Sequence, residues 1–251
     1  MFDFLAHVAA VELSDAPLVQ TVAQVRFNNQ NKLSTHSGAS AFQEAVLDRY
    51  PRLLAESQSR ITAGPGNVSA DTVPQWRLTD LNNQWACIVG PDQLAIETMA
   101  YTTWPSMRDR LNEALKVLGE VASPRIRERV GLRYVNQMPP DDAGRYSGVV
   151  DSTLLGLVDQ PGWRDALVAS LSQTVLREGD LQLAVRYGQG SAAAGVPEGV
   201  FVLDIDCSNE KAEPYDATDC MTLFDTLNDI ALRCFFALLA EPFRQHLLSR
   251  G

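Results

Sequence analysis

Apolar and polar residues alternate through Leu18–Phe27, which is the pattern of a strand with one buried face. Val25 falls on the apolar side of this segment, and Gln24 falls on the polar side. In residues 41–54 the apolar side chains instead recur at helical spacing, with Pro51 as a break or a restart. The pattern therefore predicts that the chain begins with a strand followed by a helix.

The next part of the first half is predicted to form a loop, a meander and a helix. Residues 56–74 are polar and contain two glycines and two prolines, which is typical of a loop. Three strand patterns joined by turn sequences follow within residues 75–101 and predict an antiparallel meander. A helix should come next, because Pro105 suits a first turn and Pro124 excludes continuation beyond it.

The second half repeats this order, beginning with a strand pattern at residues 125–138. A polar linker follows, and then a segment that is either a short helix or irregular. A second meander is predicted, with a glycine-rich hairpin loop at residues 188–199 between its last two strands. Its strand patterns lie at residues 168–176, 181–187 and 200–207. Residues 219–248 are predicted to form one long helix with a wide apolar face that includes Cys220 and Leu227.

These patterns predict an α+β fold with two similar halves, each an antiparallel meander sheet covered by a helix, and with a long C-terminal helix. The halves would be residues 1–124 and residues 125–251, as two units or as one continuous domain. The shared order of elements suggests an internal duplication at the level of architecture, without a residue-by-residue repeat.

Composition and charge narrow the class of protein. The chain has 251 residues, of which 45% are hydrophobic, so it can bury a sizeable core. Its net charge of −10 disfavours general binding to nucleic acid. The longest apolar run, residues 231–240, is shorter than the roughly 20 residues of a membrane span, and the N-terminus lacks the basic start of a secretory signal. We therefore expect a cytoplasmic protein that does not enter a membrane.

Sequence motifs give no local support for an enzyme. The common phosphate-binding, zinc-protease, nucleophile-elbow and dinucleotide-binding motifs are missing from the sequence, so no cofactor is implied. The four cysteines form no paired motif, which favours buried thiols. They are Cys87, Cys207, Cys220 and Cys234. The histidines, His7, His36 and His246, fall in segments where solvated side chains are expected.

The strand RIRERVGLRYVNQM contains the most unusual pattern in this acidic chain. Alternation assigns four arginines to one of its faces. They are Arg125, Arg127, Arg129 and Arg133. The opposite face is assigned Ile126, Val130, Leu132 and Tyr134. A concentration of arginine on one strand makes this segment the leading candidate for a functional site.

Three interpretations of this strand remain open. In the first, Arg127, Arg129, Arg133 and Arg186 form cross-strand ion pairs with Asp204 and Asp206 on the open face of a sheet. In the second, the arginines exceed the acids and bind a phosphate, a carboxylate or an acidic partner surface, with Asn136 as a further candidate. In the third, Asp204 and Asp206 share a divalent cation.

Several segments, in order along the chain, resemble a sporadically distributed bacterial family of similar length. They are PLVQTVAQVRF from Pro17, the tryptophan hairpin Trp76 to Trp85, YTTW from Tyr101, RERVGLRYVN ending at Asn136, and LFDTLNDIALRCFFALL. The Gly-Leu-Arg-Tyr-Val-Asn core is the most distinctive of them. Asn228 departs from the family, which is expected to carry a histidine there. A patchy distribution is typical of genes on mobile elements, including anti-phage and toxin-associated cassettes.

Three functional hypotheses follow. The preferred one is a non-enzymatic binding or interaction protein, such as an accessory, sensor or immunity component of a mobile-element or defence cassette. Its partner would be a protein, a small anionic ligand or a second copy of the chain. The alternatives are a metal-dependent enzyme that processes nucleotides or nucleic acid, and a structural subunit of a larger assembly.

Overall fold

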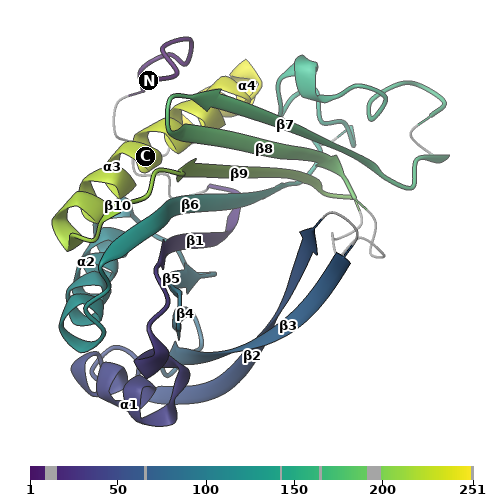
Figure 1. Cartoon of the computed structure of the whole chain (residues 1–251). Coiled ribbons are helices and arrows are strands. Elements are labelled where there is room, and N and C mark those ends of the chain that lie inside the picture. The colour runs from purple at the N-terminus through teal and green to yellow at the C-terminus, as the bar shows by residue number, and fades with distance from the viewer. Residues whose placement is uncertain (9–15, 65–66, 142, 164–165, 191–198, 250–251) are drawn as a thin grey trace.

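The computed structural model describes residues 1–8, 16–64, 67–141, 143–163, 166–190 and 199–249 (Figure 1). One antiparallel sheet of ten strands forms the centre of the molecule. The strands are β1 (Leu18–Phe27), β2 (Arg52–Gly64), β3 (Asn67–Thr79), β4 (Trp85–Gly90), β5 (Gln93–Thr98), β6 (Ile126–Met138), β7 (Ser170–Glu178), β8 (Leu181–Gln189), β9 (Phe201–Asn209) and β10 (Glu213–Pro214). The helices are α1 (His36–Ala45), α2 (Trp104–Val121), α3 (Ala217–Ala237) and α4 (Glu241–Leu248), with 3-10 turns η1 (Asn31–Ser34) and η2 (Ser152–Leu154).

The strand order explains how the two parts of the chain share one sheet. It is β2-β3-β4-β5-β1-β6-β9-β8-β7, and β10 pairs with β6 outside this path. Each part begins with a central strand, and the last strand of the following meander returns to pair with it, as β5 does with β1 and β9 with β6. Because β1 also pairs with β6, the sheet is continuous across the position between residues 124 and 125. The α+β prediction and both meanders are confirmed.

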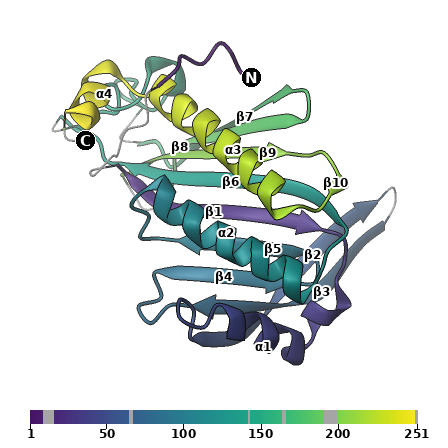
Figure 2. The same ribbon diagram turned by 90° about the vertical axis from the view of Figure 1, so that its left-hand side faces the viewer.

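Two helices cover one face of the sheet. Figure 2 shows α2 and α3 side by side across the central strands. Their apolar stripes are buried against the sheet, including Leu111 and Leu118 of α2 and Leu227 and Cys234 of α3. No described helix lies over the opposite face, and Figure 1 shows the sheet curving around that open side. The fold therefore has a buried apolar face and an open face.

In the first half, the predicted helix is wrong in position, and the predicted loop is wrong in type. The helix, α1, begins at His36, where the Thr35 hydroxyl accepts a hydrogen bond from the Gly38 amide at 3.2 Å, and it ends at Ala45. The expected loop is instead the long hairpin of β2 and β3. Most side chains of the described start of β2 are exposed, so this strand lacks the alternation that marks a half-buried strand.

The single long C-terminal helix is also wrong, because α3 and α4 are separate. Pro242 lies in the first turn of α4, and proline has no amide to continue the helix from α3. The carbonyl of Leu238 instead accepts a hydrogen bond from the Asp151 amide at 2.9 Å, and Leu239 forms a β-bridge with Val150. The segment expected to be a short helix or irregular contains the 3-10 turn η2 and further turns. Most of the predicted glycine-rich loop lies outside the described residues.

The prediction of buried thiols is confirmed, since all four cysteines are free and buried. Burial raises the pKa of the Cys220 and Cys234 thiols to about 12. Within the described parts of the chain, the helices are too short or too polar to cross a membrane.

Candidate functional site

The open face of the sheet holds arginines because β6 alternates between apolar and polar side chains. Val130 and Leu132 are fully buried beneath the helices. Arg129 and Arg133 occupy the intervening positions and therefore project from the opposite face, where they are only partly buried. The buried apolar positions thus determine which way these two arginines point.

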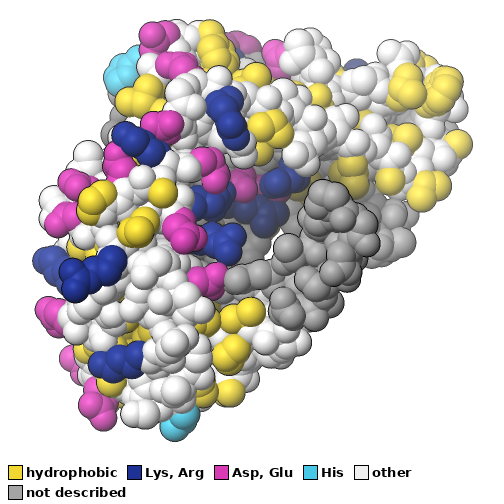
Figure 3. Space-filling model, viewed as in Figure 1, with side chains coloured by type: hydrophobic (Ala, Val, Ile, Leu, Met, Phe, Trp, Pro, Cys, Tyr) yellow, Lys and Arg dark blue, Asp and Glu magenta, His cyan; other side chains and the backbone are white. Residues whose placement is uncertain are grey.

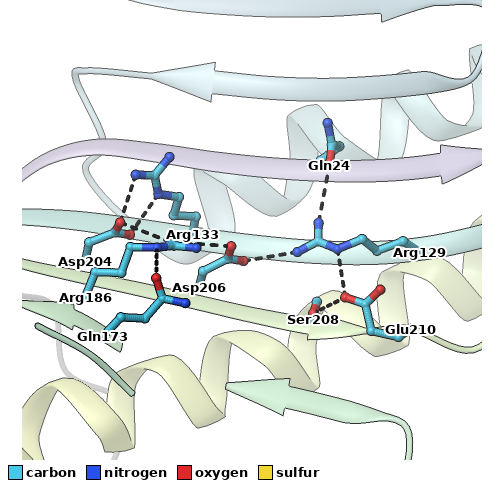
Figure 4. Close-up of polar contacts among 9 residues, drawn as sticks. All are labelled: Gln24, Arg129, Arg133, Gln173, Arg186, Asp204, Asp206, Ser208 and Glu210. Atoms are coloured by element: carbon cyan, nitrogen blue, oxygen red, sulfur yellow. Dashed lines mark hydrogen bonds and ion pairs between the residues drawn. The ribbon is translucent and has the colours of Figure 1, made fainter. Parts of the chain in front are cut away.

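The register of β8 and β9 brings acids next to these arginines. Asp206 lies opposite Arg133 in the pairing of β6 with β9. Asp204 lies opposite Arg186 in the pairing of β8 with β9. Because these side chains share one face, arginines from β6 and β8 lie next to the aspartates of β9, the strand between them. Figure 4 shows this cluster in close-up.

Asp204 is the centre of the first group of contacts. Its side chain is only 5% exposed, and both of its oxygens accept hydrogen bonds from Arg133, at 2.8 Å from Nε and 2.8 Å from Nη2. Arg186 donates from Nη1 to the same carboxylate at 3.3 Å. The hydrogen bond to Asp204 raises the pKa of the Arg133 guanidinium, which stays charged. One nearly buried carboxylate therefore holds two guanidinium groups in place.

Arg129 is the centre of the second group, and all of its guanidinium nitrogens are engaged. Nε donates to Glu210 at 2.9 Å, Nη2 to Asp206 at 3.2 Å and Nη1 to Gln24 at 3.4 Å. Burial raises the pKa of Glu210, but hydrogen bonds from Ser208 and Arg129 outweigh it and hold the pKa below its usual value. Each nitrogen of Arg129 thus already donates to a side chain of the protein itself.

Arg133 and Arg186 differ from Arg129, because each keeps a terminal nitrogen for which the described residues provide no hydrogen-bond acceptor. Arg133 uses Nε and Nη2 for Asp204, which leaves Nη1. Arg186 uses Nη1 for Asp204 and Nε for Gln173, at 3.2 Å, which leaves Nη2. Their side chains are 43% and 42% exposed. Figure 3 shows basic and acidic side chains gathered in the hollow of this face.

On the part of the open face over β1 to β5, the polar contacts are mostly between glutamine side chains. Four glutamines are joined to one another by hydrogen bonds across these strands, and Gln20 donates separately to Glu97 at 2.6 Å. The four are Gln24, Gln58, Gln75 and Gln93. Arg77 pairs with Glu56 at 2.7 Å and with Glu97 at 3.1 Å, so it is neutralised on both sides. Arg26 of β1 is 40% exposed and pairs with Asp92 at 3.4 Å, whereas Arg133 and Arg186 belong to the other part of the face.

The prediction that Arg127 shares the face of Arg129 and Arg133 is wrong. In the pairing with β1, Arg26 is opposite Arg129 and Phe27 is opposite Arg127, so Glu128 is an extra residue that forms a β-bulge. The bulge shifts the alternation, and Arg127 lies on the side of buried Phe27 and of Cys220 in α3. Its side chain is 3% exposed and pairs with Glu213 of β10.

Two other residues of the same segment also lie away from the arginine cluster. Asn136 is 3% exposed, on the helix-covered side of β6, and its amide donates to the carbonyl of Leu203 at 3.1 Å. That contact gives Asn136 a role in joining β6 to β9 and leaves it little access to a ligand. Arg125 precedes β6 and is exposed beside Tyr215, at the ends of α2 and α3.

Asp204 and Asp206 are poorly placed to hold a cation. Arg133 and Arg186 occupy the oxygens of Asp204, and Arg129 binds Asp206 at 3.2 Å. No set of three or more His, Cys, Asp and Glu side chains within the described residues has the arrangement of a metal site. The ion-pair interpretation therefore describes both aspartates, with Arg129, Arg133 and Arg186 as their partners.

Sequence reasoning missed several participants in the site. Gln173 of β7 and Ser208 of β9 contact the charged cluster; Gln173 lies within a predicted strand, and Ser208 directly follows one. Their polar side chains at the alternating positions of these strands are the signal that could have found them. Glu210 lies just after β9, in the segment that leads to β10, and only the folded structure places it beside Arg129. Strand alternation names the face of a side chain, but cross-strand register is needed to name its partner.

A separate polar contact lies on the helix-covered face. The hydroxyl of Tyr134 donates to Asn228 of α3 at 2.8 Å, and the ring of Tyr101 meets Tyr134 edge-on at 5.6 Å. Burial raises the pKa of both tyrosines, so the two phenols stay protonated at neutral pH. Residue 228 therefore ties α3 to β6 through Tyr134.

The comparisons with known proteins do not identify a function. No protein-family model matches the sequence, and no curated protein is significantly similar to it. The resemblance to a sporadically distributed bacterial family stays a prediction. The site itself, with its two half-exposed guanidinium groups, is the basis for a functional proposal.

Proposed function

We propose that this chain is a non-enzymatic binding protein and that the open face over β6, β8 and β9 binds an anionic group, a carboxylate or a phosphate, on a small ligand or a protein partner. The observation that supports it is the pair Arg133 and Arg186. Both are anchored by Asp204, and each keeps a terminal nitrogen without an acceptor among the described residues.

The physical argument is preorganisation. A free arginine side chain loses conformational freedom when it binds a ligand, and that loss weakens affinity. Here Asp204 already restrains both guanidinium groups, so an incoming anion would receive charge-assisted hydrogen bonds with less ordering. Because Asp204 is 5% exposed, it supports the arginines from below while their outer nitrogens face solvent.

The competing interpretation is that the ion pairs only keep this face hydrated. Exposed pairs contribute about 0.2 to 1 kcal/mol each to stability, and this interpretation requires no ligand. Arg129, whose nitrogens are all engaged, is an internal example of that behaviour. The two interpretations can be separated by adding an anion. The binding proposal predicts that Arg133 and Arg186 respond to it and that Arg129 does not.

The side-chain Nε–Hε signals of arginine in isotope-labelled protein provide the test. We expect titration with pyrophosphate, or with a short polyglutamate peptide, to shift the signals of Arg133 and Arg186 and to leave Arg129 nearly unchanged. Arg133→Ala should weaken binding by about 2 kcal/mol or more in protein that remains folded, which circular dichroism checks. Equal shifts of all three arginines, or none at millimolar anion, would contradict the proposal.

Arg52→Ala is the matched control for these variants. Arg52 is exposed on β2, and its Nη1 donates to Asn83 at 3.2 Å, so its loss removes one surface arginine away from the cluster. If anions were attracted only by the general charge of surface arginines, Arg52→Ala and Arg133→Ala would weaken binding equally. A specific site predicts that Arg52→Ala binds as the unaltered protein does.

The metal-dependent enzyme remains a distinct alternative with its own test. It needs Asp204 and Asp206 to exchange arginine for a divalent cation. A rise in melting temperature with millimolar Mg²⁺ or Mn²⁺, lost in Asp204→Asn, would favour it over anion binding. The proposal of a binding protein predicts no such rise.

Two wider proposals accompany this one. A role in a mobile-element or defence cassette rests on the family resemblance, and the genes that neighbour its coding sequence would test it. An internal duplication is supported by the matching order in which β5 returns to β1 and β9 returns to β6. Superposition of the two halves would contradict the duplication if their strands did not align.

A further inference from the structure

The strand β7 forms one end of the sheet and pairs only with β8. Every residue from Leu171 to Glu178 is exposed, and no backbone hydrogen bond outside the ladder with β8 involves β7 within the described residues. Leu171 is 56% exposed and Val175 is 49% exposed. A long edge strand with exposed apolar side chains and unpaired backbone groups is a template for another strand.

The strand at the other end of the sheet shows how an edge is normally protected. The described start of β2 carries Arg52 and Glu56, and charges on an edge oppose the approach of a second strand. The centre of β7 contains no charged residue from Leu171 to Val175. The two edges of one sheet therefore differ in whether they discourage pairing.

The centre of β7 is also chemically symmetric. The sequence Leu-Ser-Gln-Thr-Val reads apolar, hydroxyl, amide, hydroxyl, apolar in both directions around Gln173. An antiparallel pair of identical strands is related by a twofold axis, so position 171 of one copy faces position 175 of the other. Leucine would then lie against valine twice and serine against threonine twice, which are favourable cross-strand pairs.

We propose that β7 is a dimerisation edge and that its occupant is β7 of a second copy of this chain, paired antiparallel about Gln173. The uncharged centre allows two chains of net charge −10 to meet without opposing like charges in the strand pair. The Nε2 group of Gln173 has no acceptor among the described residues, since Arg186 binds its oxygen, so it can donate across the axis. The twofold axis would be perpendicular to the sheet, so both arginine clusters would lie on the same side of the dimer.

Charge substitutions at the two facing positions test this register. Leu171→Lys with Val175→Lys places lysine opposite lysine twice, whereas Leu171→Glu with Val175→Lys places glutamate opposite lysine twice. Both positions are exposed in the single chain, and the two variants differ only at residue 171, so their monomers should be equally stable. Circular dichroism and thermal melting check that both variants fold.

Sedimentation equilibrium gives the dimer dissociation constant of each protein. We expect the unaltered chain to dimerise below about 100 µM. The lysine–lysine variant should dissociate about 100-fold more readily, because like charges would face each other in an interface. The glutamate–lysine variant should stay within about tenfold of the unaltered chain, because its charges are complementary.

Three results would overturn the proposal. They are a monomeric unaltered chain at about 100 µM, equal dimerisation of all three proteins, and equal loss of dimerisation in both variants. The second result would place the dimer interface away from β7, and the third would exclude the register about Gln173. None of these measurements depends on a ligand for the arginine cluster, so the dimer and the proposed function stand or fail separately.

Discussion

Arg127 and Arg133 lie on the same strand, yet the fold uses them in opposite ways. Arg127 is 3% exposed and faces the helices, where it pairs with Glu213 and donates to Asn209 at 3.2 Å. Arg133 is 43% exposed on the open face and is anchored by Asp204. The bulge at Glu128 causes the difference, since it reverses the alternation between the two ends of β6. One residue type can thus stabilise the fold or be presented to solvent, depending on one extra residue.

Substitution at the buried end should have the largest effect. We expect Arg127→Ala to lower the free energy of unfolding by about 3 kcal/mol, because it removes buried packing and the contacts to Asn209 and Lys211. Urea denaturation measures this loss. Arg127→Met, which keeps the aliphatic part, should lose less. A loss below about 1 kcal/mol for Arg127→Ala would mean that this arginine is not structural.

Substitution at the exposed end should cost less stability. Arg133→Ala leaves Asp204 with Arg186 alone, and we expect a loss of about 1 to 2 kcal/mol. A double-mutant cycle with Asp204→Ala should show a coupling free energy of about 1 kcal/mol. Additive effects of the two substitutions would show that the pair contributes nothing to the fold and that its nitrogens are not restrained by Asp204.

The hydrogen bond between Tyr134 of β6 and Asn228 of α3 allows an uncharged contact of the same strand to be compared with the two arginines. Tyr134→Phe removes the donor to Asn228, and we expect a loss of about 1 kcal/mol in the free energy of unfolding. Asn228→His keeps an acceptor for Tyr134 and should lose less than Tyr134→Phe. Equal losses in the two variants would show that the side chain at position 228 acts through packing rather than through this hydrogen bond.

The smallest expected effect is the pH dependence from Glu210. Its pKa is lowered in the folded protein, so its contribution is fully present above its ordinary value of 4.5 and is lost as the pH falls below 4.5 through the folded pKa. Urea unfolding measured from neutral pH downward should show this decline. Glu210→Gln should flatten the slope below pH 4.5, and an unchanged slope would exclude Glu210 as a cause.

The strands with one buried face were predictable from the sequence. Leu18–Phe27 is found as β1 with the predicted bounds, and the meanders appear in their predicted order. The strand β2 and the first part of β3 were missed because most of the described start of β2 is exposed and the composition of residues 56–74 is that of a loop. The break at Leu238–Ala240 was missed because the apolar pattern continues across it. Pro242 and the bridge between Leu239 and Val150 end the helix regardless of that pattern.

For the candidate site, the sequence by itself determined which residue types alternate on β6, β8 and β9, because a strand has a period of two. Only the tertiary structure decided that β9 lies between β6 and β8, so that Asp204 meets both Arg133 and Arg186. It also decided the place of Arg127, because a bulge depends on the pairing of β6 with β1. Contacts between strands far apart in the chain depend on register, and no local pattern encodes register.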